Sequence, residues 1–118
     1  MIARTHRFHG RAQIQRVYKG GKLVRSAHAS LRYMVNAHAG SYRLSVVVSK
    51  KVSKKAVVRD RIRRRMYEHV RILFGSQSDA PIPYDFLLTV FDERLATLPA
   101  AEVAEEINKL FKKANLTS

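Results

Sequence analysis

The sequence predicts a single α+β domain, residues 1–118, in which helices pack on one small, mostly antiparallel sheet. A chain of 118 residues suits one domain with a modest core rather than two. Apolar residues recur at helical spacing in three stretches, and in shorter stretches they alternate with polar residues or run together. These stretches follow the order α-β-β-(β)-α-β-α, which is typical of a small sheet with helices packed on it.

The first half of the chain predicts one helix and two or three strands. Residues 10–19 carry apolar side chains at helical spacing, and a Gly-Gly pair ends that helix. A short strand is expected near 22–25. Residues 31–35 and 42–48 alternate apolar with polar side chains, and turn-forming residues separate them. We therefore expect these two strands to pair as a hairpin.

The second half predicts two helices with a strand between them. Residues 56–74 place apolar side chains on one stripe, made of Val58, Ile62, Met66, Val70 and Leu73. Residues 84–91 are mostly apolar, which is typical of a strand covered on both faces. Thr97 is expected to cap the last helix. The apolar stripe of that helix consists of Val103, Ile107, Leu110, Phe111 and Ala114.

Charge is the most unusual property of the chain. Lys and Arg number 23 against 9 Asp and Glu, and the formal net charge is +14. Residues 1–65 hold 18 of the basic residues and a single acidic one, Asp60. Self-repulsion on this scale is relieved by a polyanionic partner, so we expect an RNA-binding protein.

The densest positive charge lies in the segment from Ser49 to Arg65, SKKVSKKAVVRDRIRRR. A guanidinium matches phosphate oxygens with its planar fork, and lysine adds a mobile positive charge. A solvated helix face usually mixes both signs of charge, whereas here only Asp60 opposes the cluster. We therefore predict a phosphate-binding surface made of Lys50, Lys51, Lys54, Lys55, Arg59, Arg61, Arg63, Arg64 and Arg65.

Helical geometry sorts the arginines of this segment. At about 100° per residue, Arg59 and Arg65 flank the apolar stripe, while Arg61 and Arg64 point away from it. The lysines precede the helix and therefore lie near its free backbone N–H groups, which favour phosphate. The stripe is expected to anchor the helix while the arginines face outward.

A second surface is predicted from side chains that stack or are small and polar. Ile14 and Tyr18 lie one turn apart on the first helix, Tyr33 lies on a strand, and Ser49 follows the next strand. If they share a face, that face stacks unpaired bases, which is how single-stranded RNA is usually bound. The alternative is that these residues belong to the core, and periodicity alone favours it.

No pattern in the chain points to a catalytic centre of its own. The sequence has no Cys, its five His lack metal-site spacing, and it has no glycine-rich phosphate loop. We expect no metal, cofactor or small-molecule ligand to be bound by this chain. Its apolar runs are too short for a transmembrane helix, and its start lacks a secretory signal. A cytoplasmic protein without membrane contact is therefore expected.

The run SKKVSKKAVVRDRIRRRMYE resembles the signature of the protein subunit of bacterial ribonuclease P. That signature consists of SKK, a short basic turn, Ala-Val, and Arg-Asn-Arg followed by an apolar residue and further basic residues. The runs RFHGRAQIQRVYKGG, YDFLLTV and AEVAEEINKLFKKA are similar to the family's opening helix, last strand and closing helix. The resemblance therefore covers nearly the whole chain.

The resemblance implies a ribonucleoprotein that removes the 5′ leader from precursor tRNA. The RNA subunit of that enzyme holds Mg²⁺ and performs the hydrolysis. The protein binds ribonuclease P RNA through the arginine-rich helix and holds the leader in a cleft between the first helix and the sheet. The implied fold is like ribosomal S5 domain 2, with a left-handed βαβ crossover, against the usual preference.

Individual residues agree with the family pattern in part. Arg59 and Arg61 match the two arginines of the motif, but Asp60 stands where the family usually has Asn. Because Asp only accepts hydrogen bonds and repels phosphate, the contact of that Asn is in question here. Ile14 and Tyr18 match leader-cleft positions that are usually Phe, and Ile cannot stack on a base.

Three alternatives stay open at this point. A ribosomal or general structured-RNA-binding protein has the same charge and takes no part in cleavage. A DNA-binding helix is less favoured, because no Asn, Gln or acidic reading face accompanies the arginines. A self-contained metal nuclease would have to cleave without an RNA subunit.

Overall fold

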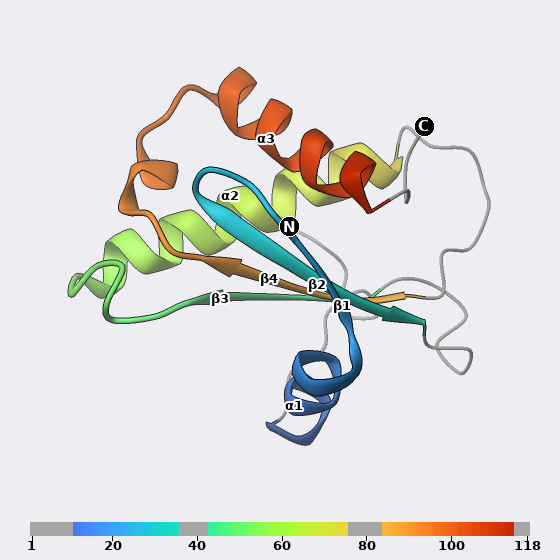
Figure 1. The fold of residues 1–118 in the computed structure, drawn as a ribbon. Helices are drawn as coiled ribbons and strands as arrows, with labels where there is room; N and C mark the ends of the chain where they lie inside the picture. Colours follow the sequence, from blue (N-terminus) through green and yellow to red (C-terminus); the bar gives the residue numbers. More distant parts are fainter. Residues whose placement is uncertain (1–10, 36–42, 76–83, 115–118) are drawn as a thin grey trace.

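The structure, a computed structural model, describes residues 11–35, 43–75 and 84–114. Four strands form one mixed sheet in the order β1-β2-β4-β3 (Figure 1). The strands are β1 (Lys22–Arg25), β2 (Ala29–Val35), β3 (Arg43–Val48) and β4 (Tyr84–Val90). β1 and β4 both pair antiparallel with β2, whereas β3 runs parallel to β4. The predicted α+β class and the order of elements are confirmed, including the short strand at 22–25.

The predicted hairpin between the second and third strands is wrong. β4 lies between β2 and β3, with Leu31 opposite Leu88 on one side and Val46 beside Leu88 on the other. β4 takes the central place because its side chains are apolar on both faces, and only a central strand covers both. The chain therefore passes from β3 through a helix to its parallel neighbour β4.

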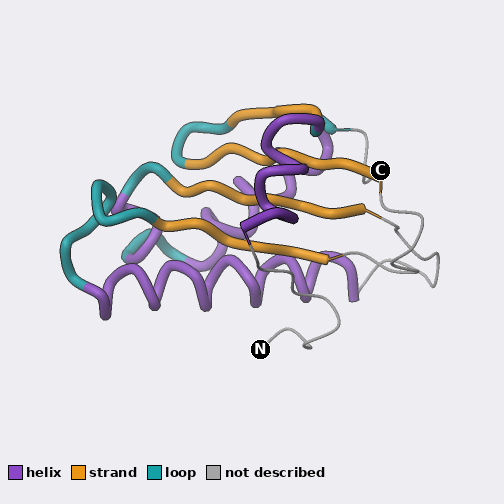
Figure 2. The backbone as a smooth tube through the Cα atoms, turned by 90° about the horizontal axis from the view of Figure 1, so that it is seen from below, coloured by secondary structure: helices purple, strands orange, loops and turns teal. Residues whose placement is uncertain are grey.

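The three α-helices of the described residues cover the sheet unequally. α2 (Ala56–Gly75) and α3 (Ala100–Lys113) lie on one face, and α1 (Arg11–Gly20) lies alone on the other (Figure 1). Figure 2, seen from the side of α1, shows this helix in front of the sheet. A short 3-10 turn, η2 (Glu93–Ala96), leads from β4 towards α3. One face of the sheet is therefore thickly covered and the other only locally.

The main core fills the space between the sheet, α2 and α3. The predicted stripe of α2 is buried at Ile62, Met66 and Val70, and the predicted stripe of α3 is buried throughout. Phe86 of β4 stacks on Phe74 at 5.7 Å between ring centroids and meets the edge of Phe111 at 5.0 Å. These contacts hold α2 firmly, so its outer side is a fixed surface.

Two details of the connections differ from or extend the predictions. Thr97 does not cap α3, because the N-cap position is Pro99 without a side-chain hydrogen bond. Thr97 instead ends η2, where its Oγ1 donates to the carbonyl oxygen of Arg94 at 3.4 Å.

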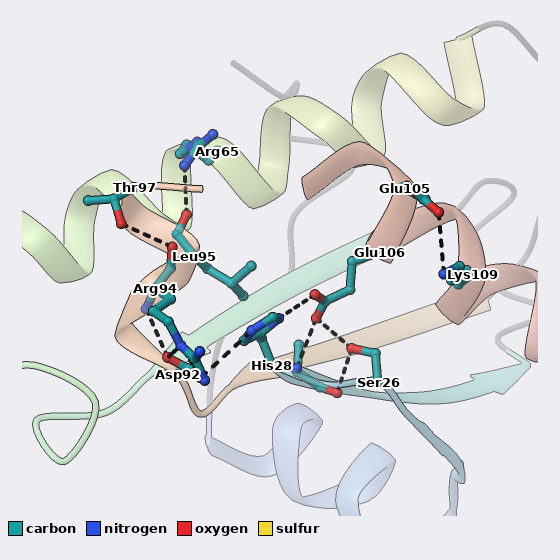
Figure 3. A network of polar contacts seen from close by, with 11 residues as sticks. Ser26, His28, Arg65, Asp92, Arg94, Leu95, Thr97, Glu105, Glu106 and Lys109 are labelled. Atoms are coloured by element: carbon teal, nitrogen blue, oxygen red, sulfur yellow. Dashed lines mark hydrogen bonds and ion pairs between the residues drawn. The ribbon is translucent and has the colours of Figure 1, made fainter. Parts of the chain in front are cut away.

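A polar network ties the β1–β2 turn to α3 (Figure 3). In it Glu106 accepts hydrogen bonds from the Ser26 hydroxyl at 2.6 Å and the His28 backbone N–H at 3.0 Å.

α1 ends where the chain passes very close to β2. The N–H of Gly21 donates to the carbonyl of Val17 at 2.8 Å. A Cβ at Gly21 would lie 2.5 Å from that carbonyl oxygen and 2.9 Å from the one of Tyr33. Glycine is therefore required here by close approach, in agreement with the predicted Gly-Gly stop.

Candidate nucleic-acid interface

The crossover from β3 to α2 presents four lysines to solvent. Lys50, Lys51, Lys54 and Lys55 are all exposed. Ser53 between them is buried, and its Oγ accepts a hydrogen bond from the N–H of Lys55 at 3.3 Å. The carbonyl of Lys55 in turn accepts from the N–H of Arg59 at 3.1 Å, which begins the helix. The buried serine thus fixes the turn, and the lysines point outward around the start of α2.

The arginines of α2 fall into two groups. Arg61 and Arg64 are exposed, and the Arg64 side chain is 75% accessible. Arg59 is half-buried, and its Nη1 donates to the carbonyl of Ser53 at 2.9 Å. Arg65 is also half-buried and donates to the carbonyl of Leu95 in η2 (Figure 3). It also donates to the carbonyl of Leu98 before α3. The outward pair agrees with the helical prediction, while Arg59 and Arg65 are engaged by the protein itself.

Asp60 lies on the outer side of α2 among these arginines. Its carboxylate is 3.4 Å from Nη2 of Arg64 and 3.6 Å from Nη2 of Arg63, and its side chain is 53% exposed. Both are surface ion pairs at i,i+3 and i,i+4 spacing, which contribute about 0–1 kcal/mol. Asp60 therefore orients two cations of the cluster and offsets part of their charge.

Burial and neighbouring charges change the pKa of three residues in the middle of α2. Burial, and then the charge of Arg61, lower the pKa of Arg65. Burial and the nearby Arg65 also lower the pKa of His69, so this histidine is neutral at pH 7. Glu68 is held as a carboxylate by the Arg71 guanidinium, which is the main cause of its pKa of about 2.

The residues predicted to form a base-stacking face are divided between the two sides of the sheet. Ile14 packs beside Val17 and Val47 on the α1 face. Tyr18 on α1 is 57% exposed, and the guanidinium of Arg32 lies 4.1 Å from its ring centroid. The exposure of the Tyr18 ring allows contact with a ligand, whereas Ile14 is partly buried beneath α1.

Tyr33 does not share this face. Its side chain packs against the main core on the α2 and α3 side, where it meets Tyr84 edge-on at 6.2 Å between centroids. The reason is strand alternation, because Tyr33 is in phase with buried Leu31. Ser49 is exposed just beyond β3 and continues the phase of Val47. The expectation that Tyr18 and Tyr33 share one face is wrong.

Sequence reasoning missed a charged cluster on the α1 face. Asp85, near the start of the interior strand β4, is fully buried and contacts Arg16 of α1 and Arg43 of β3. Arg32 of β2 donates from Nη1 to the carbonyl of Tyr18 at 3.1 Å. One signal was present in the sequence, since Asp85 interrupts the apolar run of a strand covered on both faces.

Neither a metal centre nor a membrane span is found in the part of the chain that the structure describes. Its His, Asp and Glu residues form no group of three or more that could hold a metal ion. None of the described helices is both long and apolar enough to cross a membrane.

A model of the ribonuclease P family matches residues 2–115. The chain belongs to the ribonuclease P protein family. It is similar to the ribonuclease P protein component of Synechococcus sp. (strain WH7803), with 32% identity over 114 residues, 96% of this chain and 83% of that protein. The RNase P protein of Staphylococcus aureus has a similar fold, with a TM-score of 0.80 and 22% identity over 96% of this chain and 98% of that one. The RNase P protein of Thermotoga maritima gives a TM-score of 0.77 with 23% identity, over 91% and 96% of the two chains.

Membership of the ribonuclease P protein family confirms several predictions together. The chain is the protein subunit of an endoribonuclease, and its partner is ribonuclease P RNA. The signature run occupies the crossover and the first three turns of α2. Within that run, the described cations lie on the outer side except where Arg59 and Arg65 donate to backbone carbonyls. The family signature and the outward cations therefore lie in the same segment of the chain.

Proposed function

We propose that this protein binds ribonuclease P RNA through the crossover and α2, and the 5′ leader of precursor tRNA through the surface beside α1. Holding both partners, it supports removal of the leader at the mature 5′ end. The observation that carries this proposal is the set of outward cations at the start of α2, opposed there by Asp60 alone. We further propose that residues 1–118 act as one RNA-binding domain, and that it works in the cytoplasm.

The RNA-subunit contact rests on phosphate charge rather than on base reading. We assign it to Lys50, Lys51, Lys54, Lys55, Arg59, Arg61, Arg63 and Arg64, and give Arg65 a smaller part because its donors already bind carbonyls. Such cations position RNA through its backbone. They also release counterions, so the affinity falls steeply as salt rises.

The leader contact rests on the exposed ring of Tyr18, with Ile14 one turn before it on α1 and Ser49 beyond the end of β3. An exposed tyrosine offers a face on which an unpaired base stacks, for about 1–3 kcal/mol. The guanidinium of Arg32, 4.1 Å from the ring centroid, adds a positive charge that suits the leader phosphates. Tyr33 belongs to the core side and takes no part in this contact.

The hydrolysis itself is assigned to the RNA subunit, with Mg²⁺ bound there. The contribution of this chain is electrostatic, because its cations screen the repulsion between two RNA molecules. Less Mg²⁺ is then needed to bring the scissile phosphate of precursor tRNA to the catalytic RNA. Stimulation should therefore be greatest when Mg²⁺ is scarce.

The experiment is 5′-leader cleavage of a precursor tRNA at low magnesium, with three reactions compared. One contains bacterial ribonuclease P RNA alone, one this protein alone, and one both. We expect cleavage at the mature 5′ end only in the combined reaction. Tight binding of RNA without stimulation would favour a ribosomal or general RNA-binding role, and cleavage by the protein alone would reveal an active site in this chain.

A further inference from the structure

α1 is attached to the sheet by few contacts. It has only ten residues, and isolated helices of that length are marginal in water. Its apolar contact consists of buried Val17 and Leu87, with Ile14, Met34 and Val47 partly buried around them. The position of α1 on the sheet must therefore depend strongly on its polar contacts.

The strongest of these polar contacts centres on Asp85. The carboxylate is fully buried on the central strand, at the face that α1 covers. Arg43 of β3 binds it with Nε at 2.9 Å and Nη2 at 3.0 Å, and Nη2 of Arg16 binds the oxygen Oδ2 as well. A buried carboxylate is stable only when it is paired and hydrogen-bonded, so the burial of Asp85 depends on these guanidinium groups.

This geometry fixes α1 at a defined place. Arg16 reaches from α1 to Asp85 on β4, and its Nη1 also contacts Sδ of Met34 on β2 at 3.3 Å. Two residues further along α1, the carbonyl of Tyr18 accepts from Arg32. Because Arg16 and Tyr18 belong to the same short helix, the ion pair with Asp85 sets where the exposed ring lies.

We propose that Asp85 is a positioning residue for the leader contact, acting through Arg16 to hold α1 and its Tyr18 ring in the orientation that stacks on an unpaired base. The proposal rests on the proposed function for the leader surface. Asp85 itself touches no RNA, since none of its surface is accessible. It also leaves the RNA-subunit contact on α2 untouched, because α2 lies on the opposite face of the sheet (Figure 1).

The test uses the holoenzyme reconstituted with ribonuclease P RNA and compares the dissociation constants of precursor tRNA and mature tRNA. The variants are Arg16→Met and Asp85→Asn, with Lys19→Met as the control. Lys19 is an exposed cation of the same helix that has no contact with Asp85 among the interactions described. Arg16→Met should fold, because Arg43 still pairs with Asp85.

We expect the preference for precursor over mature tRNA to fall at least about fivefold in both variants, the equivalent of one stacked base. Affinity for ribonuclease P RNA alone should stay at the wild-type value, and Arg16→Lys should recover part of the preference. The Asp85→Asn variant separates positioning from direct contact, because it leaves every cation in place. If Arg16 merely binds a leader phosphate, Asp85→Asn keeps or raises the preference, and the proposal is overturned.

Two other outcomes are also decisive. A wild-type holoenzyme without any preference for precursor tRNA would refute the proposed leader contact itself, independently of Asp85. A wild-type preference that survives in Arg16→Met would refute the role of Asp85 while leaving the leader contact intact. If Asp85→Asn does not fold, the salt dependence of precursor tRNA binding by Arg16→Met decides the matter. An unchanged slope of log affinity against log salt supports positioning, and a slope lower by about 0.7 shows that Arg16 binds a leader phosphate directly, which overturns the proposal.

Discussion

Arg65 of α2 donates a hydrogen bond from Nη1 to the backbone carbonyl of Leu95 at 2.8 Å (Figure 3). Its Nη2 donates to the carbonyl of Leu98 at 2.5 Å. Adjacent Arg64 has a side chain that is 75% exposed and pairs only loosely with Asp60. Neighbouring arginines of one basic run therefore differ in role: Arg65 binds backbone carbonyls of the fold, whereas Arg64 is exposed and belongs to the proposed RNA contact.

The first prediction distinguishes these two roles by how RNA binding depends on salt concentration. Changing Arg61 and Arg64 together to Met should lower the slope of log affinity against log salt by roughly 0.7–0.9 for each phosphate that is no longer neutralised. The melting temperature should change little, because both side chains are exposed. The measurement is binding to ribonuclease P RNA over a range of salt concentrations. A double variant with the wild-type slope would remove these arginines from the interface.

Arg65→Met is the matched variant for that measurement. It should destabilise the fold by about 1–2 kcal/mol, because two charge-assisted hydrogen bonds to carbonyls are removed. The salt slope of the folded protein should hardly change. A thermal melt beside the salt titration distinguishes the two roles, and the reverse pattern would show Arg65 to be an RNA ligand.

The second prediction concerns Asp60→Asn. Removing the carboxylate releases Arg63 and Arg64 from their ion pairs and adds one net positive charge next to RNA phosphates. We expect tighter binding of ribonuclease P RNA, with a change in stability below about 1 kcal/mol because both pairs are exposed. Filter binding at fixed salt checks this. Weaker binding would mean that the orientation of the two arginines matters more than their freed charge.

The third prediction contrasts two tyrosines. Tyr18→Leu should weaken the binding of precursor tRNA by about 1–3 kcal/mol and that of mature tRNA much less, because the leader no longer has an exposed ring to stack on. Tyr33→Leu should instead lower the melting temperature and weaken both substrates equally, because that ring packs in the core. Equal losses for the two substrates in Tyr18→Leu would contradict the assignment.

The fourth prediction concerns the loss of folding stability at acidic pH. The Arg94 guanidinium, and then the Arg94 backbone N–H, hold the pKa of Asp92 below its ordinary 3.8. The folded state therefore gains stability from ionised Asp92 above that value and loses it as the pH falls below about 3.8. The melting temperature of Asp92→Asn should fall less than that of the wild type between pH 6 and pH 3.

Glu105→Gln is the control for that experiment. Glu105 forms an exposed ion pair with Lys109 at 3.3 Å on α3, away from Asp92 (Figure 3). This variant should follow the wild-type acid limb closely. If Asp92→Asn and Glu105→Gln follow the same curve, Asp92 is not the group responsible.

Local patterns in the sequence predicted the elements but not the order of the strands. Periodicity marked the buried faces of α2 and α3 correctly, because side-chain direction repeats within each element. Strand pairing depends on contacts between distant segments, and the turn-forming residues after β2 suggested a hairpin that does not form. The apolar run of 84–91, already expected to be covered on both faces, was the available sign that this strand is central.

The positive charge of the candidate site could be predicted from the sequence, but the contacts that its side chains make within the protein could not. Composition and spacing located the basic segment and placed Arg61 and Arg64 outward. Neither pattern carries information on which carbonyl a guanidinium reaches, so the roles of Arg59 and Arg65 needed the tertiary structure. The pairing of Asp85 with Arg16 could not be predicted either, because 69 residues separate them along the chain.

The central place of β4 has a consequence for how the protein is made. β2 and β3 do not pair with each other, and each pairs with β4, the last of the described strands to leave the ribosome. A nascent chain that ends at Gly75 already contains the whole basic helix but lacks Phe86 and Leu88, against which its apolar stripe packs. Such a chain cannot close the sheet or fix the helix. We therefore expect competence to assemble with RNA to arise only after β4 has been synthesised and can join the sheet.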